Sequence, residues 1–321
     1  MEETGPINSV NALVWKVYWS ALNVPLPDFR ESTLSDLGRL IPFDAALWGT
    51  GEVDADRFHS LTLVGLNRRF SRTLERTKDI NPMFEALVRR PNTAVDVADL
   101  IPDDRFYRCD IYRRICEPFN IQRVLGTSYR DPRTGLYGLV VLFRFDRARR
   151  FSSGERERQQ HAVYHLMQAM SLGYSVHLGR VGGAAGRGGA AVCDRFGVCH
   201  DAQPAFRDLL ESRYGPWEGT RLPFPVPDPA AHAAARHRGL RVIAEPVGDL
   251  FCVQLWPEGP MDRLTDRERQ IVTSVCRGLS YKEVARPLGI APSTVSNHLY
   301  RVYGKLGVTS RTELAKLVGR Q

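Results

Sequence analysis

Signals for the start of a helix recur at short intervals within residues 264–321. In each signal a Ser or Thr precedes a Glu. The hydroxyl can then accept a hydrogen bond from a first-turn backbone N–H, while the glutamate bonds back to the cap residue. Starts spaced this closely predict a row of short helices, the layout of a helix-turn-helix module. The pairs are Thr265 with Glu268, Ser280 with Glu283, and Ser310 or Thr312 with Glu313.

The third helix of the row is expected to have one apolar and one polar face. It begins near Pro292, because proline suits the first helical position, and it follows a turn at Gly289. Residues spaced four, three and four apart give it a buried stripe: Val295, Leu299, Val302 and Leu306. The opposite face is polar and partly basic, which a DNA major groove accepts.

The same segment is basic. Residues 264–321 hold ten Lys/Arg and four Asp/Glu, a surplus of six positive charges in a chain whose net charge is +8. Clustered positive charge favours a nucleic-acid partner, because neutralising phosphates releases counterions. A solvated helix face would also explain the charge, but together with the helix spacing the charge favours DNA.

The segment carries the following set of residues: Leu264, Thr265, Arg267, Glu268, Gly278, Leu279, Ser280, Lys282, Glu283, Val284, Ala285, Leu288, Gly289, Ile290, Thr294, Val295, His298, Lys305, Leu306, Gly307, Val308 and Arg311. In these residues it resembles the DNA-binding domain of LuxR-type transcriptional regulators over its whole length. The resemblance implies a four-helix domain over residues 262–321 whose third helix reads the major groove. Its fourth helix, about Thr312 to Val318, would help two copies meet on a two-fold operator. The implied partners are double-stranded DNA and a second copy, with RNA polymerase as a further candidate.

Three positions depart from the family pattern. Ala291 stands where Ser is frequent, so the third helix loses its side-chain cap, at a cost of about 1 kcal/mol. Ser296 stands where Lys is usual, and Pro287 lies late in the second helix, where it disturbs the hydrogen-bond ladder unless the helix ends there. A second interpretation therefore stays open, in which the protein heterodimerises with another transcription factor without reading DNA.

The expected DNA contacts follow from the polar face of the third helix. Asn297 and Tyr300 can hydrogen-bond base edges or backbone, and Asn suits adenine. Arg301 and Lys305 lie farther along the helix and are expected to hold phosphates. The remaining expected contacts, near the turn and at the start of the helix, are Lys282, Ser293, Thr294 and Ser296.

The upstream region is predicted to be α+β, with an antiparallel sheet flanked by helices. Residues 179–189 contain six glycines and are expected to be a linker between modules 1–178 and 190–257. The first module resembles GAF-type sensory domains in its order of elements. The second, with strands around one helix, resembles a reduced PAS-like sensor and at this size needs a neighbour to pack on.

Candidate sites in the upstream region rest on weaker patterns. His161 and His165 are four residues apart without a third ligand, so no metal is expected. Aromatic residues of the first module could line an apolar ligand pocket, or could form ordinary core; they are Trp15, Trp19, Phe43, Trp48, Phe106 and Tyr107. A basic cluster suits a linker or dimer surface, or a second nucleic-acid contact; it comprises Arg144, Arg147, Arg149, Arg150, Arg156 and Arg158.

Other classes of protein are disfavoured. The sequence has no Gly-rich phosphate loop, paired catalytic carboxylates or nucleophile motif, so neither an enzyme nor a cofactor is expected. It also lacks a basic leader segment and an apolar run long enough for a membrane span. Its six cysteines form no CxxC pair, which indicates reduced thiols in a cytoplasm. We therefore expect a cytoplasmic transcription factor whose sensory region responds to a small molecule or a protein.

Overall fold

The computed structural model describes residues 7–52, 58–182, 188–231 and 234–318. The chain divides into two compact units. The N-terminal unit comprises residues 1–237 and 242–256, and the C-terminal unit comprises residues 238–241 and 257–321. Two antiparallel sheets with helices in the first unit and helices in the second confirm the α+β fold class. Within the described residues, no helix combines the length and apolar character needed to cross a membrane.

The first sheet of the N-terminal unit has five strands in the order β2-β1-β5-β4-β3. Its pairs are antiparallel, and β4 and β5 form the hairpin that the sequence predicts. The strands are β1 (Ala45–Gly51), β2 (Ser60–Val64), β3 (Val95–Asp96), β4 (Arg123–Arg130) and β5 (Tyr137–Arg144).

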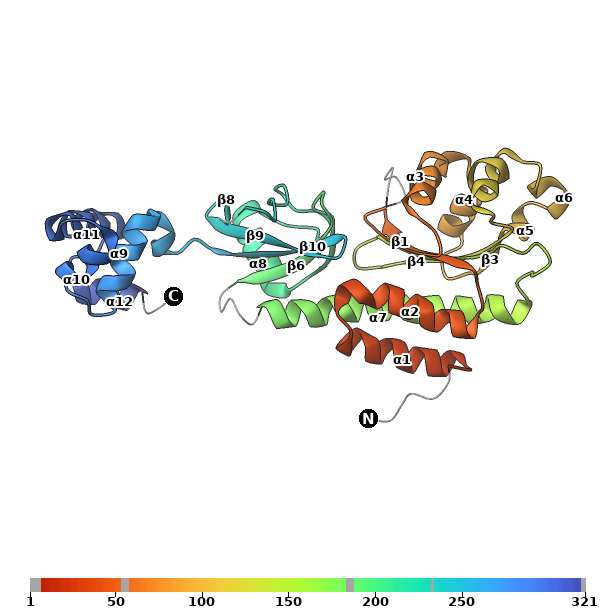
Figure 1. Cartoon of the computed structure of the whole chain (residues 1–321), viewed down its shortest axis with the longest axis horizontal. Helices are drawn as coiled ribbons and strands as arrows, with labels where there is room; N and C mark the ends of the chain where they lie inside the picture. Colours follow the sequence, from red (N-terminus) through yellow and green to blue (C-terminus); the bar gives the residue numbers. More distant parts are fainter. Residues whose placement is uncertain (1–6, 53–57, 183–187, 232–233, 319–321) are drawn as a thin grey trace. The chain divides into compact units, whose positions relative to one another are not determined.

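Each face of this sheet is covered by its own set of helices (Figure 1). Along β1, Ala46 and Trp48 enter one hydrophobic core and Ala45 and Leu47 enter the other, as the two-residue period of a strand requires. The first core lies under α1 (Val10–Asn23), α2 (Leu26–Leu40) and α7 (Ser153–Gly182). The second lies under α3 (Arg68–Arg76), η1 (Lys78–Ile80), α4 (Pro82–Arg89), α5 (Val97–Leu100), α6 (Asp103–Phe106), η2 (Tyr112–Cys116) and η3 (Glu117–Phe119).

The second sheet has the order β7-β6-β10-β9-β8. Counted within each sheet, this is the same strand order as in the first. Ala190, Val192, Leu250 and Cys252 of this sheet lie in the same buried cluster as residues of α1 and α7, so the two sheets share a core. Its elements are β6 (Gly189–Cys193), β7 (Cys199–Ala202), α8 (Pro204–Tyr214), β8 (Ala235–His237), β9 (Leu240–Val247) and β10 (Leu250–Pro257).

The predicted linker 179–189 is shorter than expected. Helix α7 continues to Gly182, and Gly189 is the first residue of β6. A Cβ at Gly189 would lie 2.2 Å from the backbone nitrogen of Phe206, so this glycine allows α8 to approach the strand. Residues 183–187 of the predicted linker lie outside the described residues.

The C-terminal unit contains the predicted row of helices: η4 (Pro260–Arg263), α9 (Asp266–Cys276), α10 (Tyr281–Leu288), α11 (Pro292–Leu306) and α12 (Arg311–Val318). Capping boxes at Thr265 and Ser280 are confirmed. At the start of α12, Ser310 Oγ accepts from the Glu313 N–H. Leu279 follows the first of these helices and is not part of its buried stripe. Because α9 ends at Cys276 and the chain turns at Gly278 (φ 97°), Leu279 remains 38% exposed.

Candidate nucleic-acid interface

Helix α11 has one fully buried stripe and one exposed polar face. Val295, Leu299 and Val302 are at most 1% exposed and anchor the helix in the core of the C-terminal unit. Tyr300 is 81% exposed, which no packing within the unit explains. The other exposed predicted contacts of α11 are Ser293, Ser296, Asn297, Arg301 and Lys305, while Thr294 and His298 are half-buried.

The corner between α10 and α11 presents this face to solvent. Helix α10 ends one residue after Pro287, so the proline disturbs only the last turn. Gly289 then adopts a left-handed conformation (φ 64°), as the turn was expected to require. Ala291 occupies the cap of α11 without a side-chain hydrogen bond, so α11 lacks the usual side-chain cap.

Lys305 lies in an intramolecular ion pair, although we had expected it to hold a phosphate. Its Nζ lies 2.7 Å from both carboxylate oxygens of Glu268 on α9. Glu268 is 4% exposed, and a buried carboxylate requires a compensating charge. Burial alone would raise the pKa of Glu268, but the bonds from Lys305 and Thr265 outweigh it and hold the pKa below its usual value. Lys305 therefore ties α11 to α9.

Two further cations hold helix ends together, which sequence reasoning did not predict. Arg311 on α12 donates to the Val275 carbonyl oxygen at 2.6 Å, near the end of α9. Arg267 on α9 donates to the Leu288 carbonyl oxygen at the end of α10. Their partners are distant in sequence, so no local pattern shows them. Both carbonyls lie in the last turn of a helix, where regular intrahelical hydrogen bonds run out. The Val275 carbonyl oxygen also accepts from the Gly278 N–H at 3.0 Å, so Arg311 adds a second bond to it.

The cations of α10 face solvent. Lys282 is exposed, as its predicted role requires. Arg286, which sequence reasoning missed as a candidate, is exposed four residues later and so lies on the same side of α10. That spacing was the signal available in the sequence. Lys282 and Arg286 on α10 and Arg301 on α11 are therefore exposed cations, as is Lys305 in its pair with Glu268.

This four-helix geometry agrees with the comparison to known proteins. Residues 262–318 match the family model described as bacterial regulatory proteins, luxR family. They form a LuxR-family helix-turn-helix domain. The segment is 43% identical over 58 residues to the transcriptional regulatory protein UhpA of Escherichia coli (strain K12), a match that covers 18% of this chain and 30% of UhpA.

Another relative is a putative HTH-type transcriptional regulator of Aeromonas salmonicida, 48% identical over 56 residues. That match covers 17% of this chain and 29% of the relative, so the similarity to both relatives spans under a third of their length. A crystal structure of Escherichia coli SdiA aligns over 96% of both chains with 11% identity and a TM-score of 0.39. A likeness this low carries no argument about this chain.

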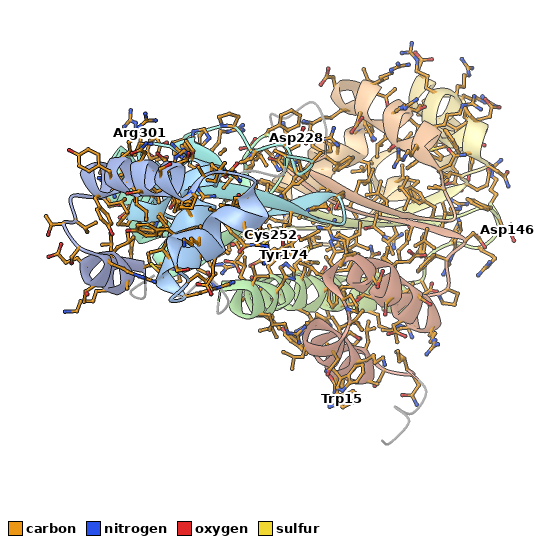
Figure 2. The ribbon with its side chains drawn as sticks, turned by 60° about the vertical axis from the view of Figure 1, so that its left-hand side comes forward. Trp15, Asp146, Tyr174, Asp228, Cys252 and Arg301 are labelled. Atoms are coloured by element: carbon orange, nitrogen blue, oxygen red, sulfur yellow. The ribbon has the colours of Figure 1, made fainter. Side chains whose placement is uncertain are left out.

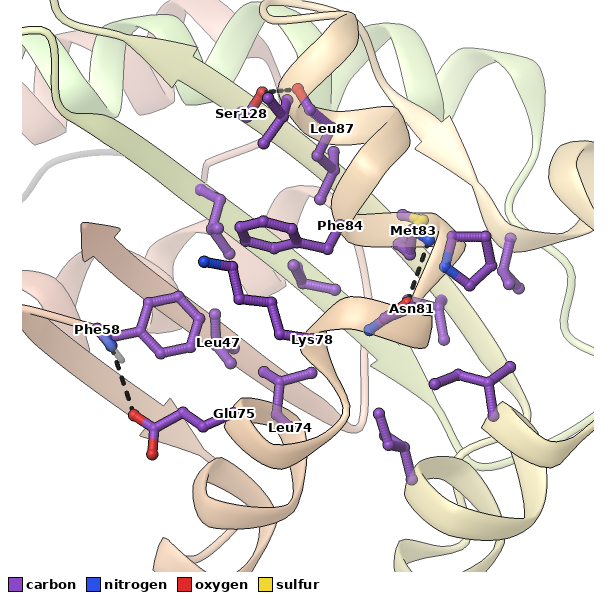
Figure 3. Close-up of a pocket in the computed structure, with 18 of the residues that line it drawn as sticks. Leu47, Phe58, Leu74, Glu75, Lys78, Asn81, Met83, Phe84, Leu87 and Ser128 are labelled. Atoms are coloured by element: carbon purple, nitrogen blue, oxygen red, sulfur yellow. Dashed lines mark hydrogen bonds between the residues drawn. The ribbon is translucent and has the colours of Figure 1, made fainter. Parts of the chain in front are cut away.

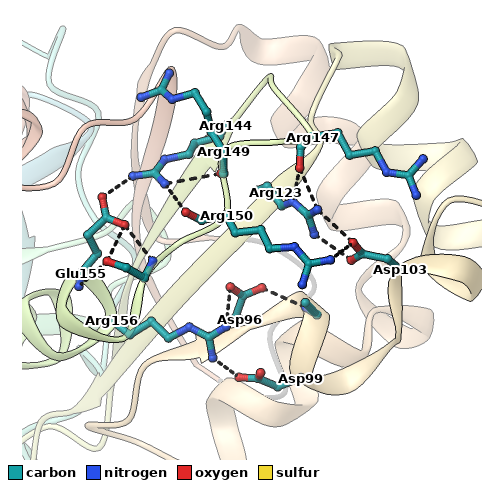
Figure 4. A network of polar contacts seen from close by, with 12 residues as sticks. Asp96, Asp99, Asp103, Arg123, Arg144, Arg147, Arg149, Arg150, Glu155 and Arg156 are labelled. Carbon is teal, nitrogen blue, oxygen red and sulfur yellow. Dashed lines mark hydrogen bonds and ion pairs between the residues drawn. The ribbon is translucent and has the colours of Figure 1, made fainter.

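Outside the LuxR-family domain, the predicted basic cluster is largely neutralised within the N-terminal unit (Figure 4). Arg123 and Arg150 both pair with Asp103, at 2.7 and 2.6 Å. The hydrogen bond from Arg123 is the main reason that the pKa of Asp103 lies below its usual value. Arg144 pairs with Glu155 at 2.6 Å, and Arg156 pairs with Asp96 and Asp99. These arginines fasten the start of α7 to the first sheet.

The six aromatic residues that could line a ligand pocket or form ordinary core are not brought together. Trp15 and Trp19 are exposed on α1. Trp48 and Phe43 belong to the core under α1, α2 and α7, on the opposite face of the sheet from Phe106. Phe106 lines a cavity, and Tyr107 lies under the guanidinium of Arg147 at 3.8 Å.

The cavity that includes Phe106 has a volume of about 100 Å³ and lies against the first sheet (Figure 3). Its lining is apolar, with Leu47 of β1, Leu74 of α3, and Phe84 and Leu87 of α4. Polar side chains there have structural partners: the Ser128 Oγ donates to the Leu87 carbonyl oxygen, and Asn81 caps α4. Lys78 lies with its Nζ 4.7 Å from the ring centroid of Phe84.

Proposed function

We propose that this protein is a cytoplasmic transcription factor that binds duplex DNA through α11, and that its N-terminal unit changes that binding in response to an input. The observation that carries the proposal is the exposed face of α11, where Asn297, Tyr300 and Arg301 stand opposite a fully buried stripe. The match to the LuxR family supports it, and its named relatives are transcriptional regulators rather than enzymes.

Within this interface we assign two kinds of contact. Asn297 and Tyr300, together with Ser293 and Ser296, would lie against base edges, where hydrogen bonds discriminate sequence. Arg301 and the α10 cations would lie against phosphates, which position the domain without reading sequence. Thr294 is half-buried and would contact the DNA backbone near the turn. Lys305 forms an ion pair with Glu268, so we do not assign it a phosphate contact.

The test is duplex DNA binding by the full chain across a salt series. The logarithm of the binding constant should fall linearly with the logarithm of salt concentration. Arg301→Ala should make the slope shallower by about 1, the contribution of one phosphate contact. Arg195→Ala, at an exposed position of the N-terminal unit, is the matched control and should leave the slope unchanged. A flat salt response of the unaltered protein would remove the proposal.

Sequence discrimination is tested separately with sites selected from a random duplex pool. Asn297→Ala should relax the preference at one base pair, at a cost of about 1–3 kcal/mol against the selected site. Binding to unselected duplex should change little. If the selected preference is the same in the variant, Asn297 does not read a base.

The second candidate function is heterodimerisation without DNA binding. The uncapped start of α11 at Ala291 and the presence of Ser296 favour it, since each weakens the reading helix. It predicts that the unaltered protein shows no salt-dependent retention on duplex DNA. The same salt series therefore separates the two functions.

For the input, we propose that the apolar cavity under α3 and α4 accepts an apolar small molecule. A ligand can shift DNA binding only if it binds the two states of the protein with different affinity. Leu74→Trp would fill the cavity, so it should abolish the binding of an apolar fluorescent dye there and leave ligand-free DNA affinity unchanged. If Leu74→Trp binds the dye as well as the unaltered protein does, this cavity is not the ligand site.

A further inference from the structure

Helix α1 carries an apolar face that the described residues of its unit leave exposed. Trp15 is 57% exposed, Trp19 43% and Leu22 46%. At 3.6 residues per turn these three residues fall within an arc of about 60°. Figure 2 shows Trp15 on the outer side of α1. The other side of the helix is buried in the core through Leu13 and Val17. Two neighbouring tryptophans left in water are a feature of contact surfaces.

Aromatic side chains also run from α1 onto α7. The Tyr18 hydroxyl lies 3.4 Å from His165 Nδ1, with the two rings edge to face. His165 in turn contacts Tyr164, which is 46% exposed and touches Tyr129. We call the following set the aromatic face: Trp15, Tyr18, Trp19, Leu22, Tyr164 and His165.

The aromatic face carries few charges, and the guanidinium of Arg180 on α7 lies at its edge, where it donates to the Leu22 carbonyl oxygen at 2.8 Å. Lys16 is the one Lys, Arg, Asp or Glu in α1, and its Nζ lies 4.6 Å from the ring centroid of Trp19. The other exposed residues at this end of the chain include Asn8, Asn11 and Asn23. Helices that lie on membranes carry several Lys or Arg, and nucleic-acid surfaces are strongly basic. Neither kind of partner fits α1.

We propose that the aromatic face is the surface through which two copies of this chain associate about a two-fold axis, with α1 against α1. A two-fold contact places a surface against itself, so a neutral aromatic surface meets its own complement. It also avoids like-charge repulsion, although each copy has a net charge of +8.

The exposed area is sufficient for such a dimer. The exposed fractions of Trp15 and Trp19 together equal one whole tryptophan side chain, or roughly 250 Å². The half-exposed Leu22 and Tyr164 add roughly 150 Å² more. A stable interface buries about 800 Å² per partner, with an apolar centre inside a polar rim. The aromatic face supplies about half of that area as apolar centre, and the neighbouring asparagines supply rim.

This inference deepens the proposed function, because a dimer would bring two reading helices to one two-fold operator. It does not depend on DNA for its test. Self-association is measured on the protein alone, so dimerisation without DNA binding would retain the inference and remove the proposed function. If the chain is monomeric in the absence of DNA but still binds DNA, the proposed function is retained and the inference is removed.

The experiment is sedimentation velocity of the full chain over a thousandfold range of concentration. The unaltered protein should pass from monomer to dimer. The double variant Trp15→Glu/Trp19→Glu should weaken association by roughly tenfold or more, because truncating or charging central aromatic residues removes most of an interface's affinity. Phe196→Glu is the matched control. It changes an aromatic residue of similar exposure (46%) outside the aromatic face and should leave association within about twofold of the unaltered protein.

Two additions keep the result interpretable. Leu22→Glu changes the same face without touching either tryptophan, and it replaces the double variant if circular dichroism shows that variant unfolded. The fluorescence of Trp15 and Trp19 should also shift to shorter wavelength as concentration rises, because their rings leave water. A chain that remains monomeric throughout, or a double variant that dimerises as tightly as the unaltered protein, would overturn the proposal.

Discussion

Removing the Lys305 ammonium should destabilise the LuxR-family domain rather than weaken a phosphate contact. Lys305→Met keeps the apolar stem and deletes the charge that lies 2.7 Å from both oxygens of Glu268. In a fully buried ion pair, removing one partner costs about 4 kcal/mol, because the other charge is left buried and unpaired. The Lys305 side chain is 42% exposed and Glu268 keeps its bonds from Thr265. We therefore expect a loss of about 1–2 kcal/mol.

Hydrogen exchange of the full chain measures this loss locally. Amides in α9 and α11 that exchange through opening of the domain should exchange roughly 5- to 30-fold faster in Lys305→Met, and amides of the N-terminal unit should not change. Arg301→Met is the matched control, since Arg301 is exposed on the same helix. It should lower the salt slope of DNA binding without changing exchange. If Lys305→Met instead lowers the slope and leaves exchange unchanged, Lys305 is a phosphate ligand and the assignment fails.

The effect should also depend on pH. The folded-state pKa of Glu268 lies below its usual value, which is about 4.3 in an unfolded chain. A depressed carboxyl pKa adds stability above the unfolded value, and this stability is lost as pH falls through the folded pKa. The difference between the unaltered protein and Lys305→Met should therefore be constant near neutral pH and shrink below about pH 4.

Four other substitutions have predicted outcomes in thermal or urea unfolding or in hydrogen exchange. Gly189→Ala should destabilise the N-terminal unit by about 2 kcal/mol, because its Cβ would meet the Phe206 backbone at 2.2 Å. Gly179→Ala, at a helical position of α7 with no atom within 4 Å of the new Cβ, should stabilise it by about 0.5–1 kcal/mol; equal effects would contradict this distinction. Ala291→Ser should add a side-chain cap and slow exchange in α11 by an amount worth about 1 kcal/mol. Asp249→Ala should cost about 1 kcal/mol, since its carboxylate accepts two hydrogen bonds from edge strand β2; unchanged urea unfolding would show that these bonds are dispensable.

The helices of the LuxR-family domain could be predicted because their signals are local. The capping boxes at Thr265 and Ser280 and the turn at Gly289 each act over three or four residues, and the structure has all three. The cap of α4 is equally local, because Asn81 directly precedes Pro82 and accepts from the Met83 N–H. The role of Lys305 could not be predicted in this way, because its partner lies 37 residues earlier and is adjacent only after α9 and α11 pack.

The N-terminal unit shows where composition misleads. A glycine-rich stretch predicts a linker, yet Gly189 is a packing position, and only the approach of α8 shows it. The aromatic residues of the first module were grouped by type, but Trp15 and Trp48 differ completely in burial. Spacing within α1 placed Trp15 and Trp19 on one side of a helix. Which side faces the core depends on the apolar residues Leu13 and Val17, which form the competing stripe.

The distinction between cations that hold helices together and cations that face solvent sets the expected strength of DNA binding. The ten Lys/Arg of residues 264–321 would, if all met phosphates, give a salt slope of about −9 per copy. Helices α10 and α11 contain four cations, and Lys305 is paired with Glu268. The remaining three, Lys282, Arg286 and Arg301, give a slope of about −2.7 per copy, and about −5.4 when two copies bind one site. A measured slope near −9 per copy would mean that the intramolecular pairs open on DNA. Cations such as Lys305 and Arg311 can reach phosphates only by leaving the carboxylate and carbonyl oxygens that they contact in the folded domain.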